Sequence, residues 1–243
     1  MDPRPRLDDR LVRPETREEM VRGRRVLAMP AKPEHGDQHF KLDYVIGAHV
    51  KEGYVGSTDM LTRLSQGSDF ATDTCVRRQG KDEKTGERYL EELAFEVVNE
   101  QSLRDMTERA EDLTARGVRR VVAIFAKRQE VREWSAELDD WRVLDPSGTL
   151  DDPTLAQPIP IRALLDRAEA DRAVVQALYA KRAPALLAIE AKGLRHGLVQ
   201  GITALCSALA IALDADRRAA LQALDAEGLE ALLATLGRER RWP

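Results

Sequence analysis

The sequence predicts an α/β fold, with a mixed sheet flanked by helices and an all-helical C-terminal extension. Two observations carry this prediction. Short apolar runs rich in β-branched residues alternate with helical patterns up to about residue 145, which is typical of a sheet covered by helices. From residue 161 onward the periodicity is almost entirely helical. The 243 residues are enough to bury a substantial core.

Charge and composition narrow the function classes. The net charge of −4 gives no global basic field for nucleic acid, although a small active groove needs only local positive charge. No apolar run is long enough to cross a bilayer, and the charged N-terminus lacks the apolar core of a signal peptide, so we expect a cytoplasmic protein. Cys75 and Cys206 lie too far apart in the sequence to indicate a metal pair or a disulfide framework.

The N-terminal third predicts an arm, a helix and several strands. Residues 1–12 are rich in Pro, Arg and Asp, which predicts a flexible arm. Residues 14–21 begin with Pro and carry early glutamates, which favours a short helix that ends at Gly23. The expected elements after it are a strand at 24–29, a helix from His35, strands at 54–65 and 73–78, and a polar loop at 79–88.

The most informative stretch is the apolar run at 93–98, which predicts a strand covered on both faces. Glu96 interrupts this run. A buried carboxylate is strongly disfavoured unless a cation, a metal or hydrogen-bond donors compensate it. Something in the fold must therefore face Glu96.

A helix and a second strand follow this run. Ser102 can cap a helix whose apolar residues recur at helical spacing, and Gly117 can end it. The β-branched run at 118–126 then predicts a strand parallel to the first one. Arg109 lies beside the apolar face of the helix, from where it can lean toward the strand that carries Glu96.

The remainder predicts a hairpin and then helices. The runs 130–134 and 141–144 alternate as hairpin strands should, with Trp134 and Trp141 as a cross-strand pair. Residues 145–160 have no periodicity, which predicts the end of the sheet domain. We therefore expect a sheet domain at 13–150 and a helical extension at 161–243.

The order of these motifs resembles the Uma-type putative restriction endonuclease family, a branch of the PD-(D/E)XK nuclease superfamily. The resemblance spans roughly residues 13 to 145, and its most specific part runs from Glu96 to Val118. It implies a restriction-endonuclease-like domain with an active site at the sheet edge. The residues that carry it, in order, are Gly23, Pro30, Pro33, His35, Asp73, Glu96, Val97, Asp105, Arg109, Gly117 and Val118.

The resemblance also implies a function and its site residues. Such nucleases hydrolyse DNA phosphodiester bonds with Mg²⁺ or Mn²⁺, which are hard cations held by oxygen ligands. The implied metal ligands are Asp73, Glu96 and the carbonyl of Val97. Arg109 stands where the family carries a lysine, and a cation there steadies the charge of the transition state.

This arginine is the main departure from the family pattern. A guanidinium can clamp a phosphate but is a poor proton acceptor. Smaller departures are Thr72, where the family has Pro before the aspartate, and Asn99, where it has Ser. They leave open an alternative, a catalytically degenerate member that binds nucleic acid or protein through its helical tail.

Each candidate also has a structural interpretation. Asp73 could pair with Arg77, and Glu96 could form a salt bridge with Arg109 or Arg104. His35 and His39 have the spacing of a metal pair on a helix, but no third ligand follows locally, which favours a structural role. Several basic residues in or near the core could line a phosphate groove or simply face solvent, namely Arg22, Arg24, Arg25, Arg116, Arg119, Arg120, Lys127 and Arg128.

The helical tail has more apolar surface than an exposed helix pair would tolerate. It must therefore pack on its own hairpin, on the sheet domain, or on a second copy of the chain. A homo-oligomer formed through these helices would suit an enzyme that cuts both DNA strands.

Overall fold

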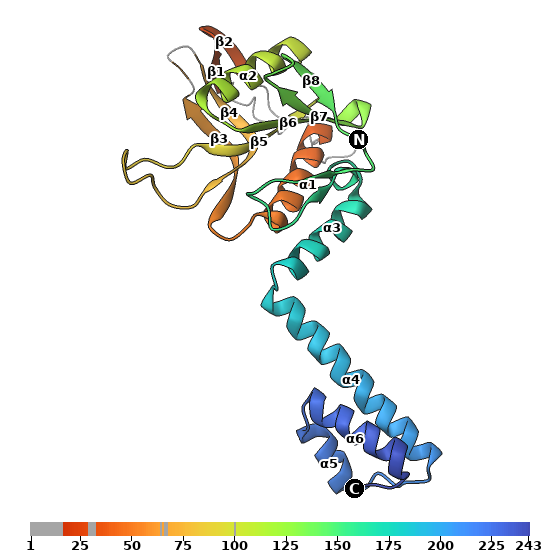
Figure 1. The fold of residues 1–243 in the computed structure, drawn as a ribbon. Helices are drawn as coiled ribbons and strands as arrows, with labels where there is room; N and C mark the ends of the chain where they lie inside the picture. Colours follow the sequence, from red (N-terminus) through yellow and green to blue (C-terminus); the bar gives the residue numbers. More distant parts are fainter. Residues whose placement is uncertain (1–16, 29–32, 64, 66–67, 100) are drawn as a thin grey trace, which may run out of the picture. The chain divides into compact units, whose positions relative to one another are not determined.

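A computed structural model describes residues 17–28, 33–63, 65, 68–99 and 101–243 of the chain (Figure 1). The chain divides into two compact units, Met1–Lys181 and Arg182–Pro243. The predicted arm at 1–12 lies outside the described residues.

The first unit is built on an eight-stranded mixed sheet with the order β2-β1-β4-β5-β6-β7-β8, in which β3 also pairs with β4. As predicted, β5 and β6 are parallel neighbours, with Glu96 paired to Ala123. The other pairs of strands in this sheet are antiparallel. The strands are β1 (Arg17–Val21), β2 (Arg24–Ala28), β3 (Tyr54–Arg63), β4 (Asp69–Arg78), β5 (Glu91–Val98), β6 (Arg120–Phe125), β7 (Glu130–Ser135) and β8 (Asp140–Val143).

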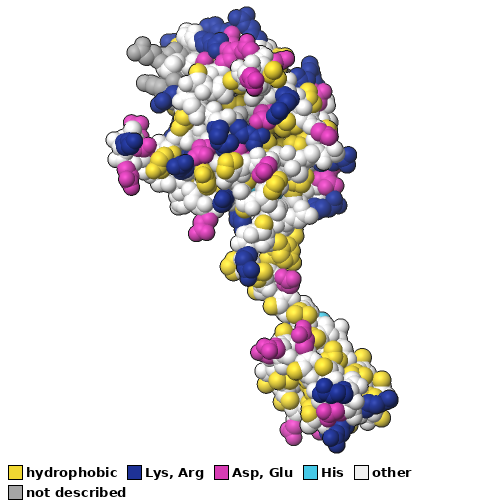
Figure 2. All heavy atoms as spheres, in the orientation of Figure 1, with side chains coloured by type: hydrophobic (Ala, Val, Ile, Leu, Met, Phe, Trp, Pro, Cys, Tyr) yellow, Lys and Arg dark blue, Asp and Glu magenta, His cyan; other side chains and the backbone are white. Residues whose placement is uncertain are grey.

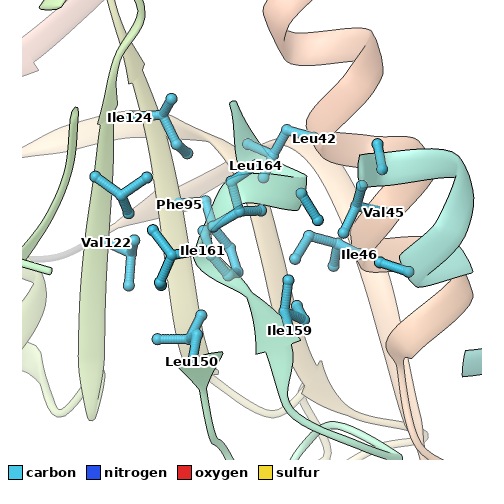
Figure 3. Close-up of a cluster of buried hydrophobic side chains, with 14 of the residues drawn as sticks. Leu42, Val45, Ile46, Phe95, Val122, Ile124, Leu150, Ile159, Ile161 and Leu164 are labelled. Atoms are coloured by element: carbon cyan, nitrogen blue, oxygen red, sulfur yellow. The ribbon is translucent and has the colours of Figure 1, made fainter. Parts of the chain in front are cut away.

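Helices cover both faces of this sheet (Figure 1). On one face, α1 (Pro33–His49), the 3₁₀ turn η3 (Ile161–Leu164) and α3 (Arg167–Ala180) bury Phe95 and Val97 of β5 (Figure 3). On the other face, α2 (Leu103–Arg116) packs against Ala94 and Val98 of the same strand. Because side chains alternate along a strand, Glu96 faces α2.

The caps of α2 are those that the sequence predicts. The Ser102 hydroxyl accepts a hydrogen bond from the backbone N–H of Asp105 at 3.1 Å. Gly117 ends the helix with a φ of 116°, a left-handed conformation that favours glycine. These local signals fix where α2 begins, and therefore which of its residues reach the strand.

The expected helix at 14–21 is wrong over its described part, because Arg17–Val21 forms β1. Residues 14–16 lie outside the described residues. Arg22 and Gly23 both have positive φ values, 51° and 75°, which form a tight turn between β1 and β2. Pairing across this hairpin overrides the helix-start pattern. The hairpin predicted from 130–134 and 141–144 is confirmed, with Trp134 and Trp141 opposite each other and their ring centroids 5.5 Å apart.

The first unit extends beyond the predicted boundary at residue 150, as far as Lys181. A short sheet of β9 (Thr149–Leu150) and β10 (Ile159–Pro160) brings the chain back to the core. Apolar residues from this aperiodic stretch, from η3 and from α3 are buried with the sheet, namely Leu150, Leu155, Ile159, Ile161, Ala163, Leu164, Ala170 and Ala173 (Figure 3). Single apolar residues between prolines and aspartates leave no periodic signal, although they complete the core.

The second unit contains α4 (Pro184–Ala208), α5 (Ala215–Ala223) and α6 (Ala226–Glu239). Its core consists of Ile202, Cys206, Leu221, Leu229, Leu232 and Leu236. The tail therefore packs on itself, one of the three predicted options. Cys75 and Cys206 are both free and buried, and they lie in different units. Within the described part of the chain, none of the helices has the length and apolar character needed to span a membrane.

Candidate active site

The buried carboxylate of Glu96 lies against the guanidinium of Arg109. Glu96 comes from β5 and is 4% exposed, and Arg109 comes from α2. The Nη2 atom of Arg109 lies 3.2 Å from Oε1 and 3.4 Å from Oε2 of Glu96. The sequence-based expectation of a partner for Glu96 is thus met by Arg109, while the other candidate, Arg104, pairs with Glu108 at 3.1 Å.

Arg109 is also engaged by other protein groups. Its Nη1 donates to Oε2 of Glu19 on β1 at 2.9 Å, and its Nη2 donates to the backbone oxygen of Ala71 on β4. Its guanidinium carbon stands 4.0 Å from the centre of the Phe70 ring. The side chain is only 12% exposed. Arg109 therefore ties α2 to three strands.

Glu19 was not predicted as a site residue. Its second oxygen accepts a hydrogen bond from the backbone N–H of Ala71 at 3.0 Å, which fixes the carboxylate beside Arg109. The signal for it in the sequence was weak, because acidic residues after a proline suit the first turn of a helix. Interpreting 17–21 as a strand would have placed Glu19 and Val21 on one face, with Val21 buried.

Asp73 lies on β4, next to the strand that carries Glu96. Its Oδ2 atom accepts a hydrogen bond from the backbone N–H of Val97 at 2.6 Å. The antiparallel register that pairs Thr74 with Phe95 brings the two acidic residues to neighbouring positions of the sheet. Arg77, the alternative partner for Asp73, instead donates to the carbonyl of Arg78 at 3.3 Å.

Burial raises the pKa values of both acidic residues. Desolvation is the largest cause for Glu96 and raises its pKa to about 8, although the guanidinium of Arg109 acts in the opposite direction. Desolvation also raises the pKa of Asp73, opposed by the hydrogen bond from Val97 and by His35, His39 and Arg109. Desolvation lowers the pKa of Arg109, but the nearby carboxyl groups of Glu96, Glu19 and Asp73 outweigh it and raise that pKa.

This charge balance fits a divalent cation. Three carboxylates carry three negative charges when ionised, and Arg109 supplies one positive charge. A divalent cation held by Asp73 and Glu96 would neutralise the remainder, and its preferred ligands are carboxylate and carbonyl oxygens. The accessible end of the site is at Asp73, whose side chain is 17% exposed, compared with 6% for Glu96.

Two histidines on α1 lie at this accessible end. The Nε2 atom of His35 is 4.0 Å from Oδ2 of Asp73, and the Nε2 atom of His39 is 2.7 Å from the backbone oxygen of Asp73. Neighbouring positions in the sequence offer no third ligand for this pair, which is why the sequence favours a structural role. The fold supplies Asp73 from another element.

Four of the eight basic residues predicted as groove candidates form ion pairs with described residues. The predicted groove candidates Arg22 and Arg24 form ion pairs with acidic residues of α2, and Arg119 and Arg120 both pair with Asp152. In Figure 2, Lys and Arg side chains lie interspersed with Asp and Glu side chains on the face of the first unit that is shown. These contacts favour the surface interpretation for four of the candidates.

Comparisons with known proteins agree with this architecture. A family model described as Uma2, putative restriction endonuclease, matches residues 5–165. The crystal structure of a putative nuclease belonging to DUF820 from Anabaena variabilis is similar, with a TM-score of 0.52 and 17% sequence identity. The match covers 65% of this chain and 94% of that chain, and it confirms the predicted nuclease-like fold. No curated protein matches this sequence.

Proposed function

Because this chain belongs to the Uma2 family of putative restriction endonucleases, we propose that it is a metal-dependent endonuclease that hydrolyses DNA phosphodiester bonds. The observation that carries the proposal is the cluster of Asp73, Glu96 and Arg109 on adjacent elements of the sheet domain. Two neighbouring acidic residues can hold a catalytic metal ion, and a cation beside them can stabilise the charge that develops in phosphodiester hydrolysis.

The proposed metal ligands are Asp73, Glu96 and the backbone carbonyl of Val97, and the proposed ion is Mg²⁺ or Mn²⁺. When bound, such an ion polarises the phosphodiester and supplies hydroxide near neutral pH. The hydrogen bond from the Val97 N–H orients the carboxylate of Asp73. Burial of Glu96 keeps its carboxyl group away from competing water.

Arg109 has a positioning role in this proposal. It donates to Glu19, Glu96 and the carbonyl of Ala71, so its guanidinium holds the ligand Glu96 and favours its ionised form. Arginine stays protonated and is a poor general base. Proton acceptance in the reaction therefore falls to another group at the site.

The same contacts favour a second candidate, the degenerate member that binds nucleic acid or protein without cleaving DNA. A guanidinium that is engaged by three protein acceptors is poorly placed to contact a phosphate. In such a protein the ion pair between Arg109 and Glu96 would serve folding alone.

A plasmid nicking assay with Mg²⁺ or Mn²⁺ separates the two candidates. An endonuclease nicks supercoiled DNA as the wild type and loses this activity in Glu96→Ala. A degenerate member is inactive as the wild type and gains activity only in Arg109→Lys, which restores the family's lysine. Wild-type protein that leaves the plasmid intact with both ions would overturn the proposed activity.

Self-association through the C-terminal helices is a further part of the proposal. Part of α4 exposes large apolar side chains, with Ile189 68% and Leu194 51% exposed. A homodimer would present two sites to the two DNA strands. Sedimentation analysis should show a dimer, and a monomer at high concentration would count against it.

The cytoplasmic location stays a prediction.

A further inference from the structure

His35, His39 and Asp73 form a cluster of potential metal ligands in the first unit. One ligand atom from each of the three side chains lies within 4.8 Å of the others. The two histidines are one turn apart on α1, and Asp73 comes from β4. Their side chains are 15%, 14% and 17% exposed, so the cluster is sheltered but reachable from solvent.

The contact between His35 and Asp73 is not a direct hydrogen bond. The Nε2 atom of His35 is 4.0 Å from Oδ2 of Asp73, beyond the length of a hydrogen bond. Two ligand atoms of a tetrahedral site, each about 2.0–2.2 Å from the ion, lie about 3.3–3.6 Å apart, so a small movement of the His35 ring would let a transition metal bridge it to Asp73. The rings of His35 and His39 meet edge to face at 72°, with their centroids 6.0 Å apart, a favourable aromatic contact that keeps the two imidazoles side by side.

His39 is already held against the strand that supplies the carboxylate. Its Nε2 atom lies 2.7 Å from the backbone oxygen of Asp73 and 3.7 Å from Oδ2 of Asp43. Asp43 is fixed in turn by the hydroxyl of Thr74, which donates to its Oδ1 at 2.6 Å. A carboxylate beside a histidine ligand orients the ring and favours cation binding. The ligands are thus largely in place before an ion arrives.

The ligand set indicates which ion would bind. Mg²⁺ prefers oxygen ligands, whereas imidazole suits first-row transition metals. A site with two imidazoles and one carboxylate also matches the three protein ligands of many zinc sites, with a position left for water or substrate.

We propose that His35, His39 and Asp73 bind a divalent transition metal ion of the Mn²⁺, Co²⁺ or Zn²⁺ class. This inference deepens the proposed function and rests on it, because Asp73 is shared with the proposed metal site at Glu96. The protein would then carry a second ion beside the one held by Glu96, with a preference for transition metals over Mg²⁺.

Titration of the tag-free full-length protein with Co²⁺ tests this site without DNA. Calorimetry gives the affinity, and the visible absorption of Co²⁺ reports imidazole coordination. We expect binding by the wild type and a loss of affinity of about tenfold or more in His35→Ala and in His39→Ala. His196→Ala is the matched control, because His196 is an exposed histidine in the second unit.

Wild-type affinity in both alanine variants would overturn the proposal. If an alanine variant fails to fold, His39→Gln keeps an N–H donor for the carbonyl of Asp73 and removes the imidazole. It should lose Co²⁺ binding too, and retained binding with an unchanged spectrum would refute the site.

The nicking assay distinguishes this outcome from failure of the proposed function. Imidazole-dependent Co²⁺ binding by a protein that cleaves no DNA supports this site and rejects the endonuclease. Mg²⁺-dependent nicking by the wild type, together with unchanged Co²⁺ binding in the histidine variants, supports the endonuclease and rejects this site.

Discussion

Replacing Arg109 with methionine should destabilise the first unit strongly. The substitution keeps most of the side-chain volume and removes the guanidinium that donates to Glu19 and Glu96. Removing one partner of a buried ion pair typically costs about 3–5 kcal/mol, because the remaining charge is left uncompensated. For a unit of this size, that corresponds to a melting temperature lower by about 6–20 °C.

The loss should depend on pH. Without Arg109, the pKa of Glu96 rises further, because the guanidinium that opposed desolvation is gone. At pH 5.5, below the wild-type pKa of about 8, the carboxyl group is neutral with or without Arg109, so the variant loses less stability than at pH 8.5, where the wild type pairs an ionised Glu96 with Arg109. Thermal unfolding should be followed by tryptophan fluorescence in a Trp242→Phe background. The remaining tryptophans, Trp134 and Trp141, both report on the first unit.

Arg104→Met is the matched control for this experiment. Arg104 lies on the same helix, its side chain is 79% exposed, and its partner Glu108 also pairs with Arg24. Because Glu108 keeps Arg24 as a partner, loss of the exposed Arg104 should cost only about 0–1 kcal/mol, and this control should melt close to the wild type. If Arg109→Met melts no lower than Arg104→Met, Arg109 is not the charge that compensates the buried carboxylates.

Three further predictions concern stability. Glu96→Gln should become more stable relative to the wild type as pH rises. Because the pKa of Glu96 is raised in the folded state, its contribution to stability is full below the unfolded pKa of 4.5 and is lost as pH rises through about 8. Urea unfolding of both proteins at pH 5, 7 and 9 without metal measures this difference in stability. A difference that is constant with pH would contradict this. Trp141→Ala should cost about 3–5 kcal/mol in the same assay, because it removes a buried ring and its hydrogen bond to Thr107, and a loss below about 1 kcal/mol would argue against this packing. A chain that ends at Lys181 should unfold cooperatively, as followed by circular dichroism, whereas a chain that ends at Leu150 should not, because it lacks part of the core. Cooperative unfolding of the shorter chain would support the domain boundary predicted from the sequence.

Local signals made much of the fold predictable. The caps at Ser102 and Gly117 fix α2, and the β-branched run after it fixes a parallel strand. The position of a carboxylate inside an apolar run identifies Glu96 as a candidate site residue from the sequence alone. Each of these inferences depends on residues close together in the sequence, where propensity and periodicity decide the structure.

Contacts between distant segments were not predictable in the same way. Glu19 reaches Arg109 from ninety positions away, and only the hairpin of β1 and β2 makes this contact possible. The carboxylate of Asp73 meets His35 and His39 through the packing of α1 on the sheet. No local pattern encodes these meetings, because tertiary packing creates them.

Binding of Mn²⁺ in the absence of DNA tests most directly whether Asp73 and Glu96 share a divalent ion. Electron paramagnetic resonance measures the free ion, and its signal should fall as the wild-type protein is added. Asp73→Asn and Glu96→Gln should each weaken binding about tenfold or more, while Asp139→Asn at an exposed hairpin position should not. Equal binding by all four proteins would contradict a metal site at these carboxylates.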